Sequence, residues 1–183
     1  MDILTLTVSI LSFLAATGSA LYARHALVFS ESATRTADAS LRFQVLVPAL
    51  AEYRSARMFV AIRHLWDFYK VNPSTLVERF QWQYEADRKA EEKLEGDELL
   101  AHVEVSLDFH RRQVTHFYNM LTSVYDEGGL QRKWLYTYWH RRELRIIPDI
   151  LVPIERALAV SIDAPVARVT IDRLTQMYED CAV

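Results

Sequence analysis

The sequence predicts an all-α protein, with one N-terminal transmembrane helix followed by a cytoplasmic antiparallel helix bundle. Only 4 glycines and 5 prolines interrupt the 183 residues, and 51% of the residues are hydrophobic. No segment sustains the alternation of apolar and polar residues that a half-buried β-strand needs. Apolar residues instead recur every three or four positions through most of the chain, which is the period of an α-helix.

The first helix is predicted to cross a membrane once. No charged residue occurs from Ile3 to Ala23, a run of 21 residues. A helix of that length spans about 30 Å, the thickness of the hydrocarbon core of a bilayer. Two other interpretations remain open, a cleaved signal peptide and a soluble core helix. Met1 and Asp2 argue against a signal peptide, because their side chains bring no positive charge before the run.

The charges that flank this run predict its orientation. No lysine or arginine precedes it, whereas Arg24, Arg35 and Arg42 follow it. Basic residues next to a membrane segment tend to stay in the cytoplasm. The lone Cys181 allows no internal disulfide, which agrees with a reducing compartment. We therefore expect a single-pass protein of the inner (plasma) membrane, with its N-terminus outside and its C-terminal domain in the cytoplasm.

Small residues give the predicted transmembrane helix one narrow side. Ser12, Ala16 and Ala20 follow one another at intervals of four, so they share a face of the helix. Another helix could approach this face closely, which makes these three the predicted transmembrane packing residues. The alternative is that small residues are simply common in membrane spans and that the hydroxyl groups bond to their own helix.

Three parts are predicted along the chain: a transmembrane anchor over 1–28, a juxtamembrane stalk over 29–48 and a helical cytoplasmic domain over 49–183. The stalk contains SESATRTADASLR, which is polar on every side. It either continues the membrane helix or forms a loose tether. Pro48 is predicted to break or kink the helix, because proline lacks the backbone N–H that a helix interior uses.

The domain is predicted to contain five helical segments. Pro148 and Pro153 should kink or split the fourth of them. Ser74 is expected to cap the second segment and Asp97 the third. The segments cover about 49–70, 74–94, 97–126, 130–158 and 166–179, and a break is expected at 161–165.

The third segment has the clearest periodicity. Its apolar residues step by three and four without a miss, which predicts one helix packed along its length against others. His110 is the only polar member, so it is either a hydrogen-bonded core histidine or a pH-sensitive or ligand-contacting group. The series is Leu100, Val103, Leu107, His110, Val114, Phe117, Leu121 and Val124.

The stretch RRQVTHFYNMLTSVYDEGGLQRKWLYTYW, from Arg111 to Trp139, follows this anchor and polar stalk. Together they resemble an uncharacterised family, a domain of unknown function, of single-pass bacterial inner-membrane proteins. In that family an arginine pair precedes an aliphatic and aromatic helix, a glycine turn follows, and an aromatic helix returns. The resemblance implies an all-helical cytoplasmic domain and supplies no catalytic residues.

Motifs for catalysis or cofactor binding are not found. The four glycines, at positions 18, 96, 128 and 129, do not form the glycine-rich loop of a dinucleotide or phosphate site. Glu98 and His102 stand four residues apart, but one such pair is not the ligand set of a di-iron bundle. We therefore expect no enzymatic activity, no cofactor and no metal.

The charges are divided into two blocks. From Glu85 to Asp108 there are nine acidic and three basic residues, whereas from Phe109 to Arg145 there are seven basic and three acidic ones. Basic residues interleaved with aromatic ones predict contact with anionic lipid or with an acidic partner. Alternatively, these are solvated charges that neutralise the acidic block. The predicted contact residues are Arg132, Lys133, Trp134, Trp139, Arg141, Arg142 and Arg145.

These observations favour a non-catalytic membrane-anchored accessory or scaffold subunit that packs against a larger integral membrane protein complex. Its expected partners are membrane lipids and that complex. The alternative is a membrane-tethered sensor or regulator whose helical domain binds a soluble partner or a ligand. Nucleic acid is not expected, because a nucleic-acid-binding domain is usually strongly basic and this chain has a pI near 6.1.

Overall fold

The structure is a computed structural model that describes residues 3–126, 132–162 and 165–181. Within these ranges the side chains are described except at 3–16, 20, 38, 41–42, 125–126, 132–133, 161–162 and 165–167. The described backbone forms helices joined by short turns and contains no strand. The prediction of an all-α fold is therefore confirmed.

The chain divides into two compact units, Met1–Gln44 and Val45–Val183. Helix α1 (Ile3–Tyr53) begins in the first unit and ends in the second. The predicted stalk, 29–48, lies entirely within α1, so it is helical rather than a loose tether.

No helix in the part of the chain with described side chains is long and apolar enough to span a membrane. The predicted span, residues 3–23, lies mostly outside that part. So do its predicted packing residues Ser12, Ala16 and Ala20.

Pro48 does not break α1, which continues to Tyr53. Proline removes only the hydrogen bond that its own N–H would make to the carbonyl of Gln44. Leu46 and Ala49 are both buried and hold this turn in the core of the second unit. The chain turns later, at Ser55, whose Oγ accepts a hydrogen bond of 3.1 Å from the N–H of Met58 and so caps the next helix.

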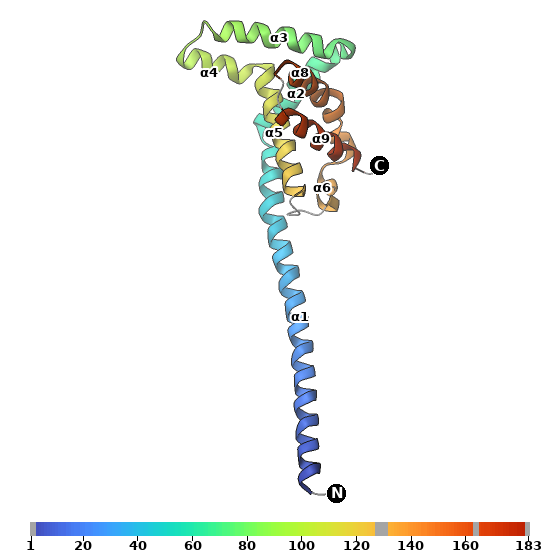
Figure 1. Ribbon diagram of the computed structural model, residues 1–183. Helices are drawn as coiled ribbons and strands as arrows, with labels where there is room; N and C mark the ends of the chain where they lie inside the picture. The colour runs from blue at the N-terminus through green and yellow to red at the C-terminus, as the bar shows by residue number, and fades with distance from the viewer. Residues whose placement is uncertain (1–2, 127–131, 163–164, 182–183) are drawn as a thin grey trace. The chain divides into compact units, whose positions relative to one another are not determined.

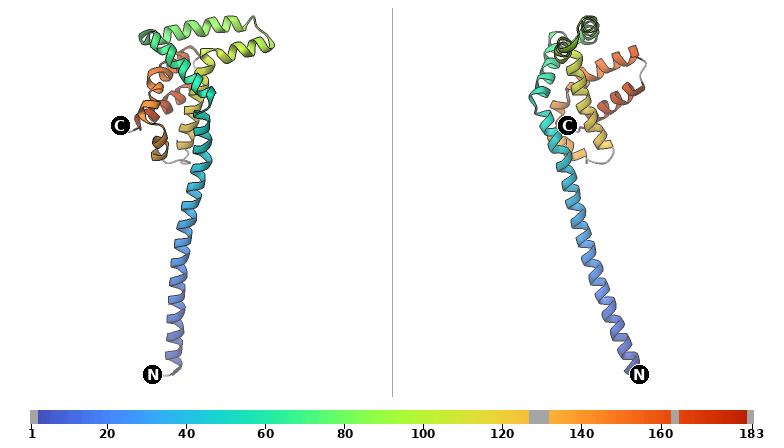
Figure 2. Two further views of the ribbon diagram at one scale, coloured as in Figure 1. Left: turned by 180° about the vertical axis from the view of Figure 1, so that it is seen from behind. Right: turned by 90° about the vertical axis from the view of Figure 1, so that its left-hand side faces the viewer.

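The second unit is a bundle of short helices around one core (Figure 1). Helix α5 packs on α2 and α9, and α8 packs on α9 and α3. Figures 1 and 2 show α3 and α4 side by side as a hairpin. The elements after α1 are α2 (Ala56–Val71), η1 (Pro73–Thr75), α3 (Leu76–Glu91), α4 (Gly96–Val105), α5 (Leu107–Asp126), α6 (Arg132–Tyr138), α7 (Arg141–Leu144), the π-helical turn η2 (Ile147–Leu151), α8 (Val152–Ile162) and α9 (Pro165–Glu179).

The prediction of one long helix over 97–126 is wrong, because the structure has two helices, α4 and α5, in this range. Ser106 has an extended backbone, with ψ of 148°, and separates α4 from α5. Its Oγ donates to the carbonyl of Val103 at 2.9 Å and accepts from the N–H of Phe109 at 3.1 Å. One serine thus satisfies backbone groups at the end of one helix and the start of the next.

The caps predicted around α3 are also wrong. Ser74 lies in η1, and its hydroxyl donates to Oδ1 of Asn72 at 2.8 Å instead of capping α3. Asp97 lies inside the first turn of α4, where the preceding Glu95 makes no capping hydrogen bond with its side chain. Gly96 takes a φ of +56°, a left-handed conformation that reverses the chain between α3 and α4 at little steric cost.

The fourth predicted segment is divided earlier than its prolines suggested. The chain turns at Trp139, between α6 and α7, and its indole is fully buried against the rings of Tyr53 and Phe117. Pro148 lies inside η2, which runs directly into α8. The break expected at 161–165 lies partly outside the described residues. The last helix, α9, confirms the final predicted segment to within one residue.

Candidate functional site

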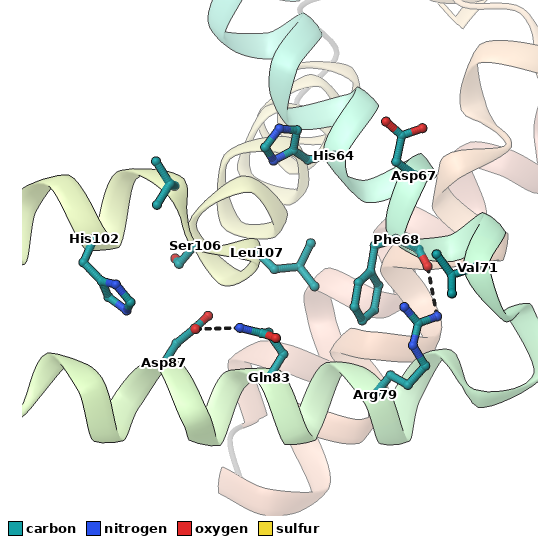
Figure 3. A pocket seen from close by; sticks show the side chains of 11 residues that line it. His64, Asp67, Phe68, Val71, Arg79, Gln83, Asp87, His102, Ser106 and Leu107 are labelled. Atoms are coloured by element: carbon teal, nitrogen blue, oxygen red, sulfur yellow. Dashed lines mark hydrogen bonds between the residues drawn. The ribbon is translucent and has the colours of Figure 1, made fainter.

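A polar groove with a volume of about 650 Å³ lies in the second unit (Figure 3). Helices α2, α3 and α4 and the start of α5 surround it. We call it the α2–α4 groove. Its lining residues are His64, Asp67, Phe68 and Val71 of α2, Arg79, Gln83 and Asp87 of α3, His102 and Val105 of α4, and Ser106 and Leu107 at the junction with α5.

The helical period explains which side chains reach this groove. Arg79, Gln83 and Asp87 stand four residues apart, so α3 presents all three on one face. His102 lies on the returning helix α4, and Figure 3 shows its ring and the Asp87 carboxylate pointing toward one another. The groove therefore depends on the reversal of the chain at Gly96.

Arg79 ties α3 to the end of α2. Its guanidinium carbon lies 4.2 Å from the centroid of the Phe68 ring, and its Nη1 donates to the Phe68 carbonyl at 3.1 Å. That carbonyl belongs to the last turn of α2, where a positive charge is favourable next to the negative end of the helix dipole. The positive charge of Arg79 is thus already engaged by the protein.

The two carboxylates of the groove differ in their partners. Asp67 is exposed and forms ion pairs with Arg63 at 3.5 Å and with Lys70 at 3.7 Å on its own helix. Asp87 accepts a hydrogen bond of 2.7 Å from Nε2 of Gln83 and forms no ion pair with any described residue. The groove therefore contains one carboxylate whose charge is not neutralised by a neighbouring cation.

Histidines stand at both ends of the groove wall. Nε2 of His102 is buried and has no hydrogen-bond partner among the described residues. His64 packs edge to face on His110 of α5, with ring centroids 4.6 Å apart. Burial lowers the pKa of His110, and the nearby His64 and Arg57 lower it further. His110 is thus a buried histidine whose neutral form the fold favours.

A buried ionic network that the sequence analysis missed lies between α5 and α8. Arg111 donates to Asp108 through Nε at 2.9 Å and pairs with Glu155, which also accepts from Thr115 Oγ1 at 2.9 Å. Arg112 donates from Nε to the other Asp108 oxygen at 2.7 Å. The spacing of Asp108 and Arg111 was a local signal, but Glu155 lies 44 residues away and could not be found from spacing.

The structure places the predicted contact residues in different surroundings. Arg141 stacks on Tyr178 at 4.8 Å and reaches the carbonyl of Cys181 at 3.4 Å, and Nε of Arg145 donates to Asp149 at 2.8 Å. Trp139 was predicted to contact a partner or lipid and lies in the core instead. Trp134 is half-buried and Arg142 is exposed, while the side chains of Arg132 and Lys133 lie outside the described residues.

Side chains suited to metal binding do not gather in the described part of the chain, where no three histidine, cysteine, aspartate or glutamate residues converge. The groove instead provides charged and hydrogen-bonding groups beside apolar ones. Compared with protein-family models, with curated proteins and with solved structures, the chain gives no match.

Proposed function

We propose that this protein is a non-catalytic, membrane-anchored accessory or scaffold subunit whose N-terminal helix and helical domain pack against a larger membrane protein complex. The observation that carries the proposal is the uncharged run 3–23 at the start of one uninterrupted helix of 51 residues.

The exposed side chains of the first unit support it. Leu21, Leu27, Val28 and Phe29 are all large, apolar and exposed in α1. Moving one such side chain out of water is favourable by about 1.5–3 kcal/mol. A bilayer or a neighbouring helix would cover these residues, whereas water leaves the helix without that stabilisation.

A second candidate is a membrane-tethered sensor or regulator, and the α2–α4 groove favours it. A concavity of about 650 Å³ that combines charged, imidazole and apolar side chains is suited to bind part of a soluble partner or a ligand. Both candidates make the helical domain a binding module rather than an enzyme.

Affinity purification of the full chain in mild detergent, followed by mass spectrometry, tests these two candidates. Stoichiometric recovery of an integral membrane complex is expected for an accessory subunit. Substoichiometric recovery of soluble proteins would favour the sensor. A reporter active only in the cytoplasm, fused after Val183, should give signal; a periplasmic signal would contradict the anchored orientation.

Two sets of substitutions locate the contact with the complex. Ala16→Leu and Ala20→Leu should weaken copurification and leave membrane localisation unchanged, because they enlarge a small face without making it polar. Arg141→Glu with Arg142→Glu should act only if the basic segment is the contact, and high salt should then mimic them. If neither set acts while circular dichroism stays unchanged, the contact lies on another surface.

A further inference from the structure

We propose that the α2–α4 groove is the docking site for a basic, amphipathic helical segment of a partner protein. The inference rests on the proposed function only in treating the domain as a binding module, and not on its attachment to a membrane. Three features carry it: the net charge of α3 and α4 beside the groove, the apolar side chains at the edges of the groove and the carboxylate of Asp87.

The helices α3 and α4, which form part of the groove wall, are strongly acidic. Residues 85–104, which make up the second half of α3 and nearly all of α4, contain eight acidic and three basic residues, a net charge of −5. Such a surface attracts a basic segment and repels an acidic one. Arg79, the cation of α3 inside the groove, does not reverse this, because it is stacked on Phe68 and bound to the Phe68 carbonyl.

The edges of the groove expose apolar side chains. Val71, at the end of α2, is 74% exposed, and Val105, at the end of α4, is 67% exposed. Helix α4 has no buried residue at all, although four of its ten residues are leucine or valine. Since a short helix gains most of its stability from packing of its apolar face, α4 would be stabilised by a segment that covers it.

Asp87 supplies the specific polar contact. Its carboxylate has one hydrogen bond from Gln83 and no cationic partner among the described residues. A lysine or arginine of a docked segment would form a charge-assisted hydrogen bond there, which is stronger than a bond between neutral groups. A helix that places apolar residues on Val71 and Val105 and a basic residue on Asp87 follows the helix-in-groove mode of recognition.

A second copy of this chain is a poorer occupant. Two of its three basic residues at 141–145 are engaged, since Arg141 is stacked on Tyr178 and Arg145 is paired with Asp149, while Arg142 is exposed. The basic residues that follow Phe109 in α5 are held by Asp108. The partner we infer is therefore a different protein.

Binding of labelled model peptides to the full chain in detergent tests the inference. The probes are a fluorescein-labelled amphipathic helix of leucine and lysine, about 18 residues long, and the same pattern made of leucine and glutamate. We expect fluorescence anisotropy to show saturable binding of the lysine peptide alone. Asp87→Asn should weaken that binding about tenfold, and Val105→Ser should weaken it as well.

Glu85→Gln is the matched control, because Glu85 is an exposed acidic residue of α3 that does not line the groove. It removes the same charge and should change affinity less than about twofold. Circular dichroism of each variant confirms that it is folded, and all variants share one detergent, so peptide partitioning into micelles cancels.

Three results would overturn the inference. Equal binding of both peptides would show that charge does not select the occupant. Equal losses in Asp87→Asn and Glu85→Gln would show that only the overall field acts. Self-association that Val105→Ser abolishes, with no binding of the lysine peptide, would make a second copy the occupant. Each readout is independent of localisation, so a failed membrane anchor would not be confused with a failed groove.

Discussion

One unbroken series of apolar residues, spaced by three and four, runs through the sequence of helices α4 and α5. The structure nevertheless buries this series in α5 and leaves it largely uncovered in α4. Helix α5 buries Val114, Phe117 and Leu121 in the core and packs on α2 and α9. Helix α4 buries no residue, and Leu100 is 63% exposed. The period thus predicts which side chains share a face, but not whether another element covers that face.

The two helices also differ in how they use charge. Helix α5 holds Asp108 and Arg111 almost completely buried in a network with Glu155 of α8. The acidic residues of α4 lie at its exposed surface. A stable core helix and a helix suited to binding can therefore follow one another with a single serine between them.

The largest effect is expected where α5 depends on a charge from another helix. Glu155→Ala should lower the free energy of unfolding by about 3–5 kcal/mol, because it removes one of the two carboxylates that pair with the buried Arg111 and also the acceptor of the Thr115 hydroxyl. Arg145→Ala, which removes an exposed cation paired with Asp149, should cost at most about 1 kcal/mol. Urea unfolding of both variants measures the difference, and similar losses would contradict a structural role for the buried network.

The core face of α5 should be nearly as sensitive. Leu121→Ala removes a fully packed side chain between α5 and its neighbours. The expected loss in the free energy of unfolding is about 2–5 kcal/mol, from lost burial and the cavity left behind. A loss below about 1 kcal/mol in urea unfolding would mean that the core closes around the site or that α5 is not central to it.

Because His110 of α5 is titratable, the free energy of unfolding should depend on pH. Its pKa is lowered in the folded state by burial first and then by His64 and Arg57 of α2. As the pH falls, His110 therefore becomes protonated near pH 6.5 in the unfolded chain, but only at a lower pH in the folded chain. Stability should be highest above that pH and fall as the pH drops, by at most about 1.4 kcal/mol per pH unit from this residue.

His110→Leu isolates this contribution, since the variant cannot titrate at that position. Thermal unfolding between about pH 8 and pH 5 should show a weaker decline for the variant than for the native chain. Parallel declines would assign the pH dependence to other groups.

The ends of a helix were predictable where the local sequence determines them. They were less predictable where packing against other helices determines them. The all-α fold and α9 follow from composition and period. Ser55 and Ser106 end helices that the sequence presents as continuous, because their capping hydrogen bonds compete with a helix only when packing turns the chain there. Pro48 shows the reverse, since packing of Leu46 and Ala49 carries α1 past a residue that usually stops a helix.

The groove was harder to predict than the fold. Its residues come from four separate helices, and no spacing in the sequence shows that His64 and His102 line the same groove. The acidic block of 85–108 was visible as a charge pattern, but Asp108 within it is buried, and Asp87 is its only acidic residue that lines the groove. Trp139 was mistaken for a surface aromatic residue because neighbouring arginines suggested an exposed segment.

Ser106 marks the boundary between the two kinds of helix, so its loss should have a moderate effect. Ser106→Ala removes the acceptor for the N–H of Phe109 and the donor to Val103. We expect a loss of about 1 kcal/mol in the free energy of unfolding, as for other N-cap residues. Ser106→Asp keeps an acceptor and should lose less in the same measurement. Equal losses would show that the hydroxyl does not act as a cap.

The smallest effect is expected on α4, where Leu100→Ala is the counterpart of Leu121→Ala in α5. Leucine and alanine both favour helices, and Leu100 lies mostly in solvent, so the free energy of unfolding should change by less than about 0.5 kcal/mol. The same substitution thus separates a covered face from an uncovered one. A loss of about 2 kcal/mol or more would mean that another molecule covers this face of α4 in solution. In that event the loss should depend on protein concentration if the covering molecule is a second copy, and urea unfolding at two concentrations would show it.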